Sequence, residues 1–116
     1  MLPTAARLRT AGDFQRVTRS GRRGAAPTLV VHVVQDGVLS GSARAGFVVS
    51  KKIGNSVVRH RVVRRLRAVA AQRLAEMPAG SALVVRALPP AADATSAALG
   101  ADLDVALRRA EGRKRR

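Results

Sequence analysis

The chain has 116 residues, enough for one domain with its own hydrophobic core, and carries a net charge of +15 at neutral pH. This charge exceeds what solubility requires and indicates a polyanionic partner, either nucleic acid or an anionic membrane surface. The lack of cysteine excludes disulfides and thiolate chemistry, and no apolar run reaches the ~18–20 residues of a transmembrane helix. Because "MLPTAARLRTAGDFQ" is no secretory signal either, we expect a cytoplasmic protein.

The first predicted element is a short helix. Thr10 is its candidate N-cap and Asp13 follows at the third helical position, while Phe14 and Val17 fall on its inner side. The segment SGRRG around Gly21 ends the helix.

Strands and two further helices follow in an order that predicts the fold. Strands are predicted at 22–26, 28–35, 43–50 and 81–87, and helices at 56–74 and from a Thr95 or Ser96 cap to about Arg109. The turn signal Asp36-Gly37 makes the second and third strands a hairpin, and therefore antiparallel neighbours. The order α-β-β-β-α-β-α predicts a single-domain α+β sandwich over 1–116, with helices packed on one sheet. Its ordered core should span about 7–109, before a disordered basic tail at 110–116.

The segment KKIGNSVVRHRVVRRLR, at 51–67, is the strongest functional signal in the sequence. It contains many cations and no acidic residue. At 100° per residue, one side of the predicted helix is apolar, with Val62, Leu66 and Ala70, and the opposite side is basic. A merely solvated helix usually interleaves Glu or Asp for i,i+4 pairs, and cations are disfavoured near a helix N-terminus. Both facts favour an external anionic ligand over a solubilising face.

The entry to this helix has the features of a phosphate-binding turn. Gly54, Asn55 and Ser56 break the preceding strand and bring backbone N–H groups to the positive end of the helix dipole. An RNA or DNA phosphate therefore fits better than a membrane, because membrane-surface helices usually bring Trp, Phe or Leu where this helix has Val and Ala. A helix-turn-helix DNA reader is disfavoured because a strand, not a helix, precedes the basic helix.

Nothing in the sequence predicts chemistry by the protein itself. There is no HExxH, Gly-x-Ser-x-Gly or GKS/GKT motif, no metal-ligand spacing, and the carboxylates are scattered. His32 and His60 are the only histidines, one in a predicted strand among valines and one between two arginines. We expect no catalytic residue, no metal site and no small-molecule substrate.

The stretch FVVSKKIGNSVVRHRVVRRLR resembles the signature of the protein subunit of bacterial ribonuclease P: a strand ending in Ser-Lys-Lys, a Gly-Asn turn, and a helix that opens with Arg-Asn-Arg. The flanking segments DFQRVTRSG and ALVVRA resemble the first helix and last strand of that family. The resemblance implies an αβββαβα two-layer sandwich on a four-stranded mixed sheet, with a left-handed crossover through the basic helix. It departs from the family at His60, which replaces the usual Asn, and at His32 and Thr18, where the family often has aromatic residues.

The resemblance also implies a function and assigns residues to it. The protein would bind the catalytic RNA of ribonuclease P and the 5′ leader of precursor tRNA, and the RNA, with Mg²⁺ held mainly by that RNA, would cleave the leader. The residues implied for catalytic-RNA binding are Arg59, His60, Arg61, Arg64, Arg65 and Arg67. Those implied for a leader cleft between the basic helix and the sheet are Phe14, His32, Lys51, Lys52 and Arg86. The alternative that the residues leave open is a non-catalytic rRNA-binding protein on a related sandwich, with a DNA-binding regulator behind it.

Overall fold

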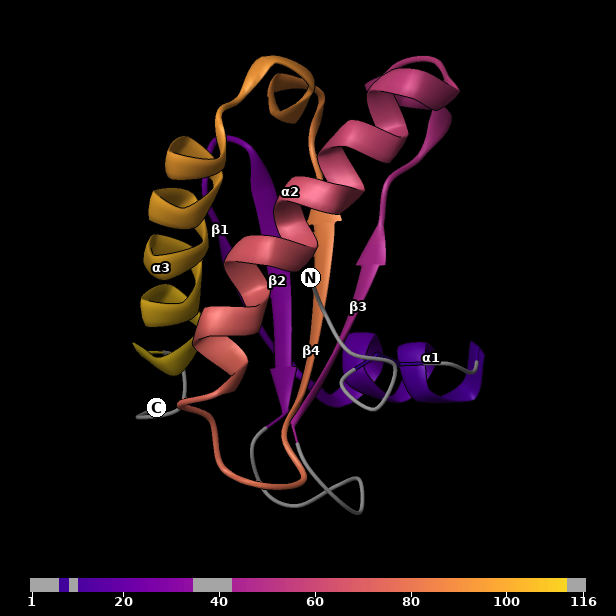
Figure 1. The fold of residues 1–116 in the computed structure, drawn as a ribbon. Helices are drawn as coiled ribbons and strands as arrows, with labels where there is room; N and C mark the ends of the chain where they lie inside the picture. Colours follow the sequence, from indigo (N-terminus) through magenta and orange to yellow (C-terminus); the bar gives the residue numbers. More distant parts are fainter. Residues whose placement is uncertain (1–6, 9–10, 35–42, 113–116) are drawn as a thin grey trace.

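The computed structural model describes residues 7–8, 11–34 and 43–112, and its elements follow the predicted order (Figure 1). They are α1 (Ala11–Ser20), β1 (Arg22–Ala25), β2 (Leu29–Val34), β3 (Arg44–Val48), α2 (Ser56–Leu74), β4 (Ala82–Ala87) and α3 (Ser96–Gly112). The 3₁₀ turns η2 (Lys51–Ile53) and η3 (Pro89–Asp93) precede α2 and α3. The α-β-β-β-α-β-α prediction is confirmed.

The four strands form one mixed sheet in the order β1-β2-β4-β3. β2 is antiparallel to both β1 and β4, whereas β3 and β4 are parallel. The predicted hairpin pairing of the second and third strands is therefore wrong, because β4 lies between them. The physical reason is the composition of β4, whose residues from Ala82 to Val85 are buried on both faces. A strand of this kind gains most at the centre of a sheet, where both of its edges are paired. The predicted turn at 36–37 lies outside the described residues.

The crossover from β3 through α2 to β4 is left-handed. Figure 1 shows both strands pointing upward, with α2 in front of the sheet and β4 to the left of β3. A right-handed connection would place the second strand to the right in this view. The resemblance implied this rare left-handed crossover, which the general preference for right-handed crossovers would not have predicted.

The main core lies between α2, α3 and one face of the sheet. Alternate residues of β2 and β4 point into it, together with the apolar side of α2. Because each buried Val or Leu is worth roughly 1.5–3 kcal/mol, this contact fixes α2 firmly on the sheet. Fully buried members are Leu29, Val31, Val62, Leu66, Leu83, Val85, Leu99 and Leu103.

The opposite face of the sheet is only partly covered, by α1. Val17 packs with Ala82 and Val84 in a second, smaller cluster. The Phe14 ring lies so close to Gly46 that a Cβ atom there would sit 2.3 Å from the ring. The two-layer description therefore holds for α2 and α3, while α1 adds a partial third layer. None of the other described residues covers the sheet face beyond α1, and this part of the face is called the open face below.

The last helix is longer than predicted. α3 continues to Gly112, and Ala110 is buried, so the first three residues of the predicted tail are helical. Arg109 donates from Nη1 to the carbonyl oxygen of Ala25 at 2.7 Å, which fixes the end of α3 on β1. Residues 113–116 lie outside the described part of the chain.

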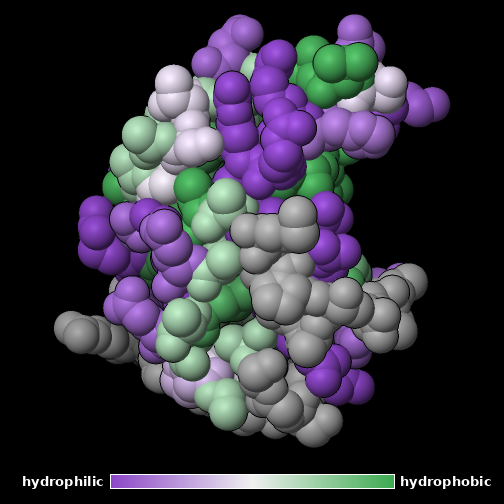
Figure 2. Space-filling view, in the orientation of Figure 1, coloured by the Kyte–Doolittle hydropathy of each residue, from purple (hydrophilic) through white to green (hydrophobic). Residues whose placement is uncertain are grey.

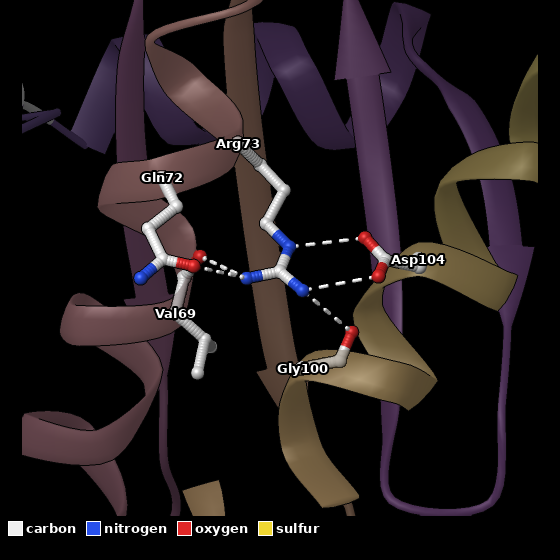
Figure 3. Close-up of polar contacts among 5 residues, drawn as sticks. All are labelled: Val69, Gln72, Arg73, Gly100 and Asp104. Carbon is white, nitrogen blue, oxygen red and sulfur yellow. Dashed lines mark hydrogen bonds and ion pairs between the residues drawn. The ribbon is translucent and has the colours of Figure 1, made fainter. Parts of the chain in front are cut away.

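A bidentate ion pair joins the C-terminal half of α2 to α3 (Figure 3). The Nε and Nη2 atoms of Arg73 donate to the two carboxylate oxygens of Asp104, each at 3.0 Å. The same guanidinium also donates to the carbonyl oxygens of Val69 and Gly100. The hydrogen bond between the two side chains lowers the pKa of Asp104 and raises the pKa of Arg73.

Replacement of Asp104 by Asn should lower the free energy of unfolding by about 0.5–1 kcal/mol at neutral pH, near the upper end for partly exposed pairs. The side chains are 21% and 45% exposed, so solvent screens the pair. Because the folded pKa of Asp104 is depressed, the contribution is present above the unfolded pKa of about 3.9 and is lost as pH falls through the folded value. Urea unfolding at pH 7 and pH 3 tests this, with Asp93→Asn as control. A destabilisation that is equal at both pH values would contradict it.

Candidate RNA interface

The N-terminal half of α2 presents the predicted basic side of the helix to solvent. This surface, called the basic stripe below, consists of Arg59, His60, Arg61, Arg64, Arg65 and Arg67. His60 and Arg64 lie on its exposed crest, and Lys51 and Lys52 are exposed in the turn that precedes the helix. Figure 2 shows hydrophilic side chains gathered over this half of α2. The spacing of Arg61 and Arg65 places them on one flank, and Val63 and Arg67 share the other.

No carboxylate neutralises this stripe within the described residues. The ion pair of α2 that the structure records is that of Arg73, near the C-terminal end of the helix, with Asp104. The Nε atoms of Arg59, Arg61 and Arg67 are buried and have no hydrogen-bond partner in the described part of the chain. The positive charge that no carboxylate neutralises on this side of α2 is what the phosphates of an RNA backbone would satisfy.

Two arginines of the stripe do have partners inside the protein. Arg61 Nη2 donates to the carbonyl oxygen of Ala92 at 3.0 Å, and Arg65 Nη1 donates to that of Ala94 at 2.7 Å. A carbonyl is neutral, so both side chains keep their full positive charge. Each guanidinium also has further N–H donors beyond these bonds.

The predicted phosphate-binding turn is built as a capped helix start. Asn55 Oδ1 accepts from the Val58 N–H at 3.0 Å, and the Gly54 N–H donates to the Lys51 carbonyl at 3.2 Å. Gly54 has a φ of +156°, which favours glycine. The N–H groups of Ser56 and Val57 have no partner among the described residues, and they are the donors left for an anion.

The residues predicted for the leader cleft gather mainly on the open face of the sheet. His32 and Arg86 alternate with residues of the main core along β2 and β4, so they point to the face of the sheet opposite α2. Phe14, on α1, packs against the same face.

The space directly between α2 and the sheet is filled by Val62 and Leu66, which are fully buried. Beside β3, Phe14 shares a hollow with Val63 and Arg67 of the basic helix, and a leader cleft between that helix and the sheet stays a prediction there.

A cavity of about 530 Å³ lies where β3 and β4 end. Lys52 and Arg86 line it together with Val48, Leu88 and Pro89. Phe14 lines a separate hollow of about 200 Å³ beside β3. The structure thus brings Lys52 and Arg86 together, and it places His32 and Phe14 elsewhere on that face.

Arg23 joins the open face and was missed by sequence reasoning. It lies directly across from His32 in the register of β1 with β2. Burial and the charges of Arg23 and Arg86 lower the pKa of His32. Its Nδ1 atom is buried without a hydrogen-bond partner in the described residues. Only the strand register reveals this neighbourhood, and a pair of arginines at 22–23 was the one signal in the sequence.

The comparisons with known proteins identify the family. A family model described as Ribonuclease P matches residues 2–111. The chain belongs to the ribonuclease P protein family. Curated relatives named Ribonuclease P protein component include those of Streptomyces bikiniensis, 50% identical with 97% of both chains covered, and Nocardioides sp., 49% identical with 94% of both covered. The solved Staphylococcus aureus RNase P protein has a TM-score of 0.78 at 30% identity, covering 90% of this chain and 94% of that one.

Ribonuclease P is a ribonucleoprotein endoribonuclease that matures the 5′ end of tRNA. This chain is its bacterial protein subunit and works with the ribonuclease P RNA. None of the helices in the described part of the chain is long and apolar enough to cross a membrane. The polyanion inferred from the net charge is thus an RNA.

Replacement of Arg64 by Ala should reduce the salt dependence of binding to the ribonuclease P RNA. If Arg64 neutralises one phosphate, the slope of log K against log[salt] should fall by about 0.7–0.9. The slope is measured by titrations at several salt concentrations. Arg108→Ala removes another exposed cation, from α3, and should leave the slope unchanged. An unchanged slope for Arg64→Ala would place Arg64 outside the interface.

The lowered pKa of His32 predicts a specific pH dependence of stability. As pH falls through about 6.5, the unfolded chain takes up a proton that the folded protein does not, so stability should decrease until the folded pKa is reached. NMR titration of the ring Cε1–H should give a midpoint below 6.5, with His60→Asn used to assign the two histidines. The variant His32→Gln should lose this part of the pH dependence, and a midpoint of 6.5 or higher would contradict the prediction.

Proposed function

We propose that the two basic regions of the chain bind different RNAs. The stripe on α2 binds the ribonuclease P RNA, and the N–H groups of Ser56 and Val57, at the predicted phosphate-binding turn, take one of its phosphates. The residues assigned to this surface are Arg59, His60, Arg61, Arg64, Arg65 and Arg67. The support is their unneutralised charge and their position on a helix that the core holds rigidly.

The open face of the sheet, we propose, binds the 5′ leader of precursor tRNA. The observation that carries this is the gathering of Arg23, His32 and Arg86 on a sheet face that α1 leaves uncovered, with Lys52 at its end. Cations spread over an open sheet face suit the backbone of a single strand. Phe14, packed on Gly46, offers one aromatic ring at the border of this face.

Leader binding would give the subunit a way to favour substrate over product. Precursor and mature tRNA differ by the leader, so any contact made to the leader strengthens binding of the precursor alone. Each charge-assisted contact contributes roughly 1.5–3 kcal/mol when it is well formed. The protein would thereby speed release of the mature tRNA relative to a complex that held both equally.

The chemistry is assigned to the RNA partner, with Mg²⁺ held mainly by that RNA. In the described ranges of the chain, no three His, Cys, Asp or Glu side chains come together in a group able to hold a metal ion. We further propose that the protein works in the cytoplasm, where its RNA partner is made.

The test is a reconstituted enzyme with a bacterial ribonuclease P RNA at low Mg²⁺. The wild-type protein should restore cleavage of precursor tRNA, and Arg86→Ala should weaken precursor binding about tenfold while leaving binding of mature tRNA unchanged. Arg108→Ala, on α3, is the matched control. If Arg86→Ala weakened binding of precursor and mature tRNA equally, the leader would not bind this face.

The protein without RNA should cleave no precursor tRNA at any pH or Mg²⁺ concentration. The reason is that the described residues contain no group of three His, Asp or Glu side chains able to hold a metal ion, and the sequence has none of the catalytic motifs named above. Incubation of RNA-free protein with labelled precursor checks this. Correct 5′ cleavage that follows the protein through successive purification columns would refute it.

A further inference from the structure

We infer that Arg61 and Arg65 are positioning residues that hold η3 in place, and that through η3 they shape the cavity between Lys52 and Arg86. The part of this inference that concerns the leader rests on the function proposed above. The stripe would then contain two kinds of arginine. Arg61 and Arg65 hold another segment of the protein in place, whereas Arg64 contacts only the RNA.

The two side chains reach the same short segment from one flank of α2. They are four residues apart on the helix, and their partners, Ala92 and Ala94, are two residues apart at the end of η3. Arg65 makes the shorter contact, at 2.7 Å, and Arg61 the longer, at 3.0 Å. Two parallel bonds from one rigid helix fix both the position and the direction of the segment.

The carbonyl groups concerned depend on these arginines. Within η3, the N–H of Ala91 donates to the Leu88 carbonyl and that of Ala94 to the Ala91 carbonyl. These bonds leave the carbonyls of Ala92 and Ala94, for which the described structure supplies the arginines as donors. A half-buried carbonyl that loses its donor is costly, so the segment is expected to shift or loosen without them.

η3 is also continuous with a wall of the cavity. Leu88 and Pro89 line the cavity together with Lys52, and they form the start of the turn whose far end the arginines hold. The near end is fixed by the Leu88 N–H, which donates to the Thr28 carbonyl at 2.8 Å. Between these anchors only Ala91 is fully buried. The segment that carries this wall is therefore held at its far end by α2.

Arg64 provides a matched comparison. It has the same charge, lies on the same helix and is exposed, and it makes no hydrogen bond in the described part of the structure. The variants Arg61→Met, Arg65→Met and Arg64→Met each remove one charge and keep a long side chain. Only the first two remove a donor to η3.

Amide hydrogen exchange measured by NMR tests the structural half of the inference on the full chain. Exchange at Ala91 and Ala94 should rise about fivefold or more in Arg61→Met and Arg65→Met, the factor for one net hydrogen bond, and stay unchanged in Arg64→Met. Unchanged exchange in α3 and β4 shows that each variant is folded. If both Arg61→Met and Arg65→Met leave the η3 amides as protected as in the wild type, the inference is wrong, whatever the leader does.

The functional half is tested in the reconstituted complex by the ratio of affinities for precursor and mature tRNA. Arg61→Met and Arg65→Met should lower this ratio, whereas Arg64→Met should weaken assembly with the RNA and keep the ratio. If the affinity ratio fell equally in all three variants, the loss of positive charge would explain the effect and the contacts to η3 would not. That result would overturn the inference. A wild-type complex with no preference for precursor would instead refute the proposed leader site, and the exchange experiment would still decide the role of the arginines.

Discussion

The arrangement of the whole molecule depends on β4, the strand that is paired on both edges and buried on both faces. Its alternate residues divide the structure: Leu83 and Val85 face α2 and α3, while Val84 and Arg86 face the side of α1. Because β4 lies beside β3 and parallel to it, α2 must cross the sheet diagonally to connect them. The crossing carries the basic half of α2 above the ends of β3 and β4, where η2, η3 and the cavity meet.

The charge of α2 is divided between two tasks along its length. Near its C-terminal end Arg73 is neutralised by Asp104, and this pair holds the helix against α3. In its N-terminal half the arginines meet no carboxylate among the described residues, and the apolar side beneath them keeps the helix on the sheet. The hydrophobic core therefore offsets the repulsion among the cations, and the unfavourable charge remains available for binding a polyanion.

Sequence patterns predicted local structure well and spatial neighbours poorly. The helix at 56–74 was predicted to the residue, because an Asn-Ser cap and a long apolar periodicity both mark it. The pairing of the second and third strands was wrong, because adjacency in sequence says nothing of a later strand that inserts between them. The open face was missed for the same reason: Arg23 and His32 meet only through strand register. The left-handed crossover came from family resemblance alone.

The two outer edges of the sheet have a consequence for the assembled particle. β1 ends at a carbonyl held by Arg109, and β3 is bordered by residues 7–8, with the Leu8 N–H donating to the Ala45 carbonyl at 2.8 Å. A free strand edge is a template for pairing with another sheet. While the protein is alone, its net positive charge also keeps copies apart. Bound RNA neutralises part of that charge on the protein, so the positions already occupied at the two edges limit strand pairing between protein subunits after assembly as well.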